Sequence, residues 1–253
     1  MIEFIIMIIV LAIIMEMIDA GFGMGYGTVL SPVLIAFGVP VLTVVPSVLI
    51  SQAIGGFTAS AIHHKLKNAE LMPTKEGIPK DLKVSIIITV LGVIATILAV
   101  FLAVSIPAFW IKLYIGVLVL AMGLLILSNF KFVFSWGKMA IVGIISSFNK
   151  GLSGGGFGPV VTGGQIIAGQ NNKNAVGATT LAEAPICITG FVCYVLLQGF
   201  PDLNIMLPLI IGAIIGAPIG AFLTNKIPEK HLKLVIGILI TILGLWTLIK
   251  LFM

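Results

Sequence analysis

The sequence predicts an all-α, polytopic membrane protein with two inverted repeats of five membrane segments each, including broken or re-entrant Gly-rich helical hairpins. First, the chain of 253 residues is 59% hydrophobic and 9% charged, and its mean hydropathy is +1.24, whereas soluble domains carry about 25% charged residues. Second, a glycine-rich turn occurs twice between apolar segments, at 21–27 and 151–158. We therefore expect one membrane domain, 1–253, with repeats at 1–128 and 129–253.

Each half is predicted to open with a helical hairpin. The first arms are 2–20 and 134–149, and the second arms are 28–38 and 158–169. Each second arm has little more than half of the roughly 20 residues that a spanning helix needs. The turns should therefore lie deep in the membrane, where irregular backbone must be enclosed by protein or line a watery cavity. Six further apolar runs are long enough to span the bilayer, at 41–62, 84–105, 108–128, 174–197, 205–225 and 231–252.

The two halves match each other at a constant offset around the glycine turns. A second match, of Pro107 and Lys112 with Pro228 and Lys233, occurs near the end of each half. Chance glycine matches are a risk in a Gly-rich chain, but the proline-to-lysine match favours duplication. The corresponding pairs used below are Asp19 and Lys150, Gly23 and Gly154, Gly25 and Gly156, Gly27 and Gly158, and Gln52 and Glu183.

The positive residues predict the orientation. All 14 are lysines, and most lie in or beside the loops 63–83, 129–138 and 226–233. The positive-inside rule places these loops in the cytoplasm, which leaves Lys112 and Lys250 on the other side. The repeats are then inverted, and both termini lie on the outer side of the cell membrane. Because the lysines set the topology, the net charge of +5 is not an indication of nucleic-acid binding.

The glycine turns are expected to bind a small anion. Glycine lets backbone N–H groups approach a ligand closely, and a helix N-terminus behind each turn attracts negative charge. The alternative is that these glycines only permit close helix packing. The candidate substrate-binding residues are Gly23, Gly25, Gly27, Thr28, Lys150, Ser153, Gly154, Gly155, Gly156, Gly158 and Thr179.

Several ionisable residues lie within apolar segments, where charge is costly and usually functional. Lys150 has three interpretations: it pairs with Asp19, attracts the anionic substrate, or snorkels to the surface. Glu183 is either a proton relay or a hydrogen-bonded structural acid. Asp19, Glu183 and Gln52 are the candidates for coupling to a proton or sodium ion. Glu16 lies on the same helical face as Asp19 and is a second acid in the cavity or a partner of Lys150.

Enzyme chemistry is not expected. The stretch 151–154 reads G-x-S-G, as in the rhomboid intramembrane proteases, which leaves a protease as a remote alternative. A serine nucleophile needs a nearby histidine base, but His63, His64 and His231 lie at helix ends or in loops, where they should be solvated. The histidines and the two cysteines give no metal cage, and no phosphate-binding motif is present, so no cofactor is expected.

The chain resembles the sulfite exporter TauE/SafE family, also called the toluene sulfonate uptake permeases, over essentially its whole length. The motifs that carry the resemblance are 21–32, 151–158 and 174–181, and Met24 and Tyr26 depart from the pattern in the first copy. The resemblance implies transport of small sulfur-containing or organic anions such as sulfite, sulfonates and sulfoacetate.

We therefore expect a multi-pass secondary transporter in the cell membrane, working by alternating access around a central anion site. An anion channel is the alternative, because it would share the motifs without needing a coupling residue. The expected partners are the small anion, the lipid bilayer and a coupling proton or sodium ion, and a homodimer is left open.

Overall fold

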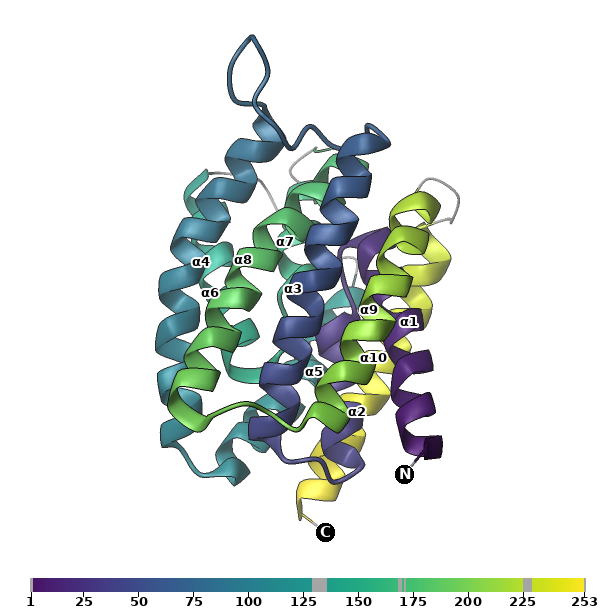
Figure 1. The fold of residues 1–253 in the computed structure, drawn as a ribbon, viewed down its shortest axis with the longest axis vertical. Helices are drawn as coiled ribbons and strands as arrows, with labels where there is room; N and C mark the ends of the chain where they lie inside the picture. The colour runs from purple at the N-terminus through teal and green to yellow at the C-terminus, as the bar shows by residue number, and fades with distance from the viewer. Residues whose placement is uncertain (1, 129–135, 168–169, 171, 225–228, 253) are drawn as a thin grey trace.

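The protein is all-α (Figure 1). The computed structural model describes residues 2–128, 136–167, 170, 172–224 and 229–252. Among these residues, six helices are long and apolar enough to cross a membrane, namely α1, α3, α4, α5, α8 and α9. The chain is therefore a multi-pass membrane protein. The helices are α1 (Ile2–Phe22), α2 (Tyr26–Ala36), α3 (Val41–Lys65), α4 (Lys80–Ser105), α5 (Ala108–Leu127), α6 (Trp136–Ser153), α7 (Gly158–Ile167), α8 (Asn172–Gln198), α9 (Leu203–Leu223) and α10 (Glu229–Phe252).

The observed helices follow the predicted segments with small shifts at their ends. The six predicted spans correspond to α3, α4, α5, α8, α9 and α10. The short second arms are α2, with 11 residues, and α7, with 10 residues. At about 1.5 Å per residue, each reaches roughly 16 Å, about half of a hydrocarbon core roughly 30 Å thick.

The observed glycine turns are shorter than predicted, because α1 continues to Phe22 and α6 to Ser153. Each of these helices ends at a glycine with positive φ, which is 69° at Gly23 and 74° at Gly154. This left-handed conformation terminates helices and favours glycine. The amides of the two glycines still donate to backbone carbonyls four residues earlier, at 2.6 and 2.8 Å. The residues just before each turn are therefore held in the last helical turn.

The long helices pack in a continuous row, in the order α1, α9, α3, α8, α4, α6, in which each makes its most extensive contacts with its neighbours. Helices α5 and α10 pack mainly on each other, and α10 also contacts α2. The two chain ends lie at the same end of the bundle, whereas the loop between α3 and α4 lies at the opposite end (Figure 1).

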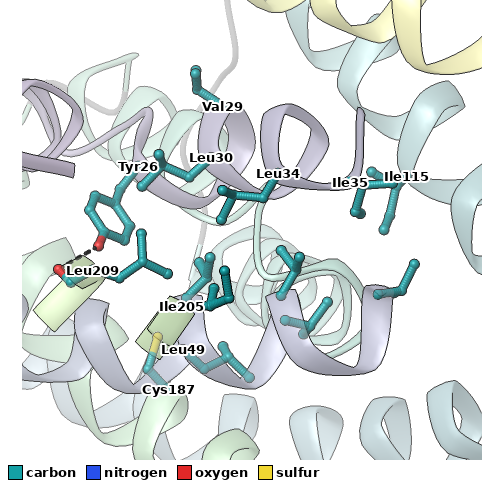
Figure 2. Close-up of a cluster of buried hydrophobic side chains, with 14 of the residues drawn as sticks. Tyr26, Val29, Leu30, Leu34, Ile35, Leu49, Ile115, Cys187, Ile205 and Leu209 are labelled. Atoms are coloured by element: carbon teal, nitrogen blue, oxygen red, sulfur yellow. Dashed lines mark hydrogen bonds between the residues drawn. The ribbon is translucent and has the colours of Figure 1, made fainter. Parts of the chain in front are cut away.

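Helix α2 is enclosed by protein. Nine of its 11 residues are buried, and Leu30 and Leu34 lie with Leu49 of α3 and Ile205 of α9 in one apolar cluster (Figure 2). A helix too short to span the bilayer is thus surrounded by other helices of the protein.

Small residues let α1 and α9 approach closely. Gly212, Gly216 and Gly220 follow one another at four-residue spacing on α9, which places them on one face. A Cβ atom added at any of them would meet the backbone of α1, and at Gly216 it would also lie 2.9 Å from the Cβ atom of Glu16. The two helices therefore meet through their backbones, as small residues allow in membranes.

We expect the substitution Gly216→Leu to lower the stability of the folded protein by about 1–3 kcal/mol, the usual range for overpacking. The added side chain has backbone rather than a mobile side chain in front of it. Thermal unfolding in detergent measures the effect. The control is Ile215→Leu, because Ile215 is 44% exposed. An unchanged melting temperature for Gly216→Leu would show that the contact is loose.

The expectation that His63 is solvated is wrong. Its side chain is fully buried, and its Nε2 atom lies 2.8 Å from the carbonyl oxygen of Ala20 at the end of α1. Its Nδ1 atom hydrogen-bonds with Asn68, whose amide also donates to the carbonyl of Ala221 at the end of α9. Helix ends leave carbonyls unpaired, and His63 and Asn68 satisfy two of them. The side chain of His231 lies outside the described part.

Candidate functional site

The two glycine turns lie directly against each other. A Cβ atom at Gly27 would overlap the carbonyl oxygen of Gly154, and one at Gly158 would overlap the carbonyl oxygen of Gly23. Gly155 faces the backbone at the start of α2 in the same way. These positions need glycine because two backbones touch there. The structure therefore brings together the two glycine turns, which lie about 130 residues apart in the sequence.

Hydrogen bonds cross between the turns in both directions. The amide of Gly156 donates to Oγ1 of Thr28 in α2 (3.0 Å), and Oγ1 of Thr162 in α7 donates to the carbonyl of Gly23 (2.9 Å). Thr179 of α8 joins this group, with its hydroxyl 3.0 Å from that of Thr162. Each short helix thus binds the turn of the other hairpin.

Backbone amides that were expected to bind an anion donate to oxygen atoms of the protein itself. The amide of Tyr26, at the start of α2, donates to Oδ1 of Asp19 (3.2 Å). The amide of Gly155 donates to Oγ of Ser153 (3.2 Å). A carboxylate therefore lies at the N-terminus of α2, where the helix dipole favours negative charge.

Lys150 is buried and paired with an acid. Its side chain is 1% exposed, so the snorkelling interpretation is wrong. Its Nζ atom lies 2.8 Å from Oε1 of Glu183 in α8 and also donates to Oε1 of Gln52 in α3. The salt bridge is therefore made to Glu183 rather than to Asp19.

A chain of four buried side chains links the two halves at this point. Asp19 accepts from Nε2 of Gln52 (3.0 Å), Gln52 accepts from Lys150, and Lys150 pairs with Glu183. We call these four residues the polar chain. It joins α1, α3, α6 and α8, and its members satisfy one another, as buried charges must. Of the residues predicted for ion coupling, Gln52 and Glu183 thus contact the predicted substrate-binding lysine, and Asp19 is linked to it through Gln52.

Two residues of this region, Tyr26 and Ser51, were not among the site residues predicted from the sequence. The hydroxyl of Tyr26 donates to Oγ of Ser51 (2.8 Å) and lies 3.2 Å from the carbonyl oxygen of Leu209 in α9 (Figure 2). A signal was available for Tyr26, because Phe157 stands at the corresponding place in the second half. At this position the first half therefore has a phenol hydroxyl that the second half lacks.

Some buried oxygen atoms beside the turns have no hydrogen-bond partner among the described residues. They include Oγ of Ser31 and Oε1 of Gln165. A Cβ atom added at Gly154 would lie 2.7 Å from Oγ of Ser31, so this hydroxyl faces the second turn. Such atoms are rare in folded proteins and call for an explanation. Among the described residues, no group of acidic, histidine or cysteine side chains is arranged to hold a metal ion.

Comparison with known proteins identifies the family of the chain. The family model described as "Sulfite exporter TauE/SafE" matches residues 8–247. The "Probable membrane transporter protein YtnM" of Bacillus subtilis (strain 168) is 24% identical over 254 residues, which cover 95% of this chain and 81% of the relative. The "Probable membrane transporter protein YdhB" of the same organism is 24% identical over 253 residues, covering 95% and 97%. No solved structure matches the chain significantly. The chain therefore belongs to the sulfite exporter TauE/SafE family of membrane transporters and is not an enzyme.

Proposed function

We propose that the protein is a secondary transporter for a small oxyanion or organic anion, such as sulfite, a sulfonate or sulfoacetate. The observation that carries the proposal is the buried Lys150 at the contact between the two glycine turns. Intramembrane charges mark substrate and ion pathways, and broken helices that meet near the midplane are typical of secondary transporters. The family's description as sulfite exporters supports an anionic substrate.

The substrate anion would exchange places with carboxylates of the protein. Lys150 is held by Glu183, and the N-terminus of α2 is held by Asp19. An incoming oxyanion offers the same negative charge and the same oxygen acceptors. The free oxygen atoms of Ser31 and Gln165 are within the same region. Because the turns touch through their backbones, we assign this structure to a closed state, and the turns would separate to admit the anion.

Two inverted repeats, 1–128 and 129–253, account for the packing of the helices. Helix α1 packs on α9 as α6 packs on α4, and α3 packs on α9 as α8 packs on α4. The positive φ values at Gly23 and Gly154 also correspond. Parts of the lysine-rich loops 129–138 and 226–233 lie outside the described residues. The orientation with both termini outside is a further part of the proposal and is based on the positive-inside rule.

Alternating access would follow from the separation of two helix groups. Helices α5 and α10 pack mainly on each other, and the remaining long helices form the continuous row. Relative movement of these groups keeps the contacts within each group and changes those around the turns. Such rocking of one group against another around a fixed site is the usual mechanism in this class.

We expect sulfite or sulfoacetate to raise the melting temperature of the purified protein, because ligand binding to the folded state stabilises it. At about 100 times the dissociation constant, the gain is about 2.7 kcal/mol. Chloride at the same ionic strength is the control, and acetate and taurine are compared as a carboxylate and a zwitterionic sulfonate with less negative charge. No shift with any of the sulfur anions would contradict the proposal. Flux in liposomes that neither saturates nor responds to ion gradients would favour a channel.

A further inference from the structure

Glu16 is a buried acid outside the polar chain. It lies one helical turn before Asp19 in α1 and is 1% exposed. Its Oε2 atom has no hydrogen-bond partner among the described residues. The carboxyl group lies against Gly55 of α3, where a Cβ atom would overlap it, and its Cβ atom lies against Gly216 of α9. The side chain of Glu16 is therefore enclosed between α3 and α9.

The charges that face Glu16 do not balance it. The acidic groups Asp19 and Glu183 and the single ammonium group of Lys150 interact with it electrostatically, and Tyr26 and Cys187 are the other titratable neighbours. Helix α9, on the remaining side, carries no titratable side chain. Three ionised carboxylates around one lysine would leave two uncompensated negative charges in the membrane interior, which is very costly.

Glu16 is the member of this group that is least able to stay ionised. Lys150 compensates Glu183, and Asp19 accepts hydrogen bonds from Gln52 and from the amide of Tyr26. Oε2 of Glu16 receives none. A neutral carboxylic acid without a partner costs far less than an ionised one. The form of Glu16 with the lowest free energy at this place is therefore the protonated, neutral acid.

The packing itself does not require an acid at this place. The constant offset between the halves makes Ser147 the counterpart of Glu16. Ser147 is also fully buried, and its hydroxyl lies against Gly92 of α4, as the Cβ atom of Glu16 lies against Gly216 of α9, the counterpart of α4. A small neutral side chain thus fills the equivalent position. An acid kept in the membrane against this cost indicates function.

We propose that Glu16 is a proton-binding site that couples proton movement to anion transport. Oε2 would take one proton from water when the site is open to one side and return it to water on the other side. A protonated Glu16 removes a negative charge near Lys150, so the proton and the anion favour each other's binding and travel together. The coupling step rests on the proposed transport function, whereas the protonation of Glu16 does not.

The transport test uses the full chain in liposomes with radiolabelled sulfoacetate. A gradient of one pH unit, acid outside, should concentrate sulfoacetate up to about tenfold per coupled proton. The substitution Glu16→Gln keeps the shape and neutral charge of the protonated acid. It should abolish accumulation driven by the pH gradient while sulfoacetate exchange at equal pH continues. The control Glu3→Gln changes an exposed acid at the start of the same helix and should accumulate like the wild type.

The proton itself is tested by infrared spectroscopy of the purified protein at neutral pH. The wild type should show the carbonyl stretch of a buried protonated carboxylic acid, and both Glu16→Gln and Glu16→Ser should lack it. The serine variant copies the other half and guards against a folding defect of the glutamine variant. A band that persists in both variants, or continued pH-driven accumulation in Glu16→Gln, would overturn the proposal. A wild type that shows the band but does not bind or exchange sulfoacetate would instead overturn the proposed substrate.

Discussion

Replacement of Lys150 by Met should destabilise the protein by about 3–5 kcal/mol, the usual cost of removing one partner of a buried ion pair. Glu183 would keep its charge but lose the ammonium group that lies 2.8 Å away, and Gln52 would lose a donor. Transport and the thermal shift with sulfite or sulfoacetate should disappear as well. Thermal unfolding in detergent and flux into liposomes measure the two effects separately.

The double variant Lys150→Met with Glu183→Gln separates structure from function. It removes the charge of Glu183 together with that of Lys150, while Asp19 keeps its hydrogen bonds from Gln52 and from the amide of Tyr26, so most of the lost stability should return. Anion binding should not return, because the positive charge is still missing. The control Lys83→Met removes an exposed lysine of α4 and should change neither property. A single Lys150→Met variant with normal stability and normal flux would reject both roles of this lysine.

The substitution Gly27→Ala should lower stability by about 3 kcal/mol and reduce transport at least tenfold, toward the upper end of overpacking effects. The new methyl group would overlap the carbonyl oxygen of Gly154 and approach Nζ of Lys150. The obstacle is backbone, so no side chain can move aside. The two turns would be held apart at the point where α2 meets the second hairpin.

Gly137→Ala is the matched control for this experiment. Gly137 also lies near the start of a helix, and a Cβ atom there has no atom within 4 Å. Alanine is a better helix former than glycine, so this variant should be as stable as the wild type or slightly more stable. Equal behaviour of the two variants would mean that the contact between the turns is not needed.

The sequence predicted the helices and the turns well, because both depend on residues that are close together along the chain. Runs of apolar residues long enough to span the membrane locate the spans, and the duplicated glycines mark the two breaks. The correspondence of Asp19 with Lys150 and of Gln52 with Glu183 already selected the four side chains of the polar chain. The repeat does not show which of these four side chains form hydrogen bonds or ion pairs with one another.

The partners depend on how helices cross in space. The pairing of Lys150 with Glu183 results from the contact of α6 and α8 with each other and with α3, which no spacing along the chain specifies. His63 shows the same limit. Its position at a helix end beside a lysine-rich loop suggested solvation, yet the ends of α1 and α9 converge there and bury it. Exposure at a helix end is decided by neighbouring helices rather than by the helix itself.

The side-chain amide of Gln52 carries opposite polarity at its two ends, and the surrounding charges fix its direction. Its NH₂ group faces an acid and its oxygen faces a base, so it connects the two without holding a net charge. In the proposed cycle, an anion that captures the ammonium group releases the oxygen end while the NH₂ end stays attached. A rotation of the uncharged Gln52 amide would then couple anion binding at Lys150, in the second half of the chain, to the environment of Asp19 in the first half.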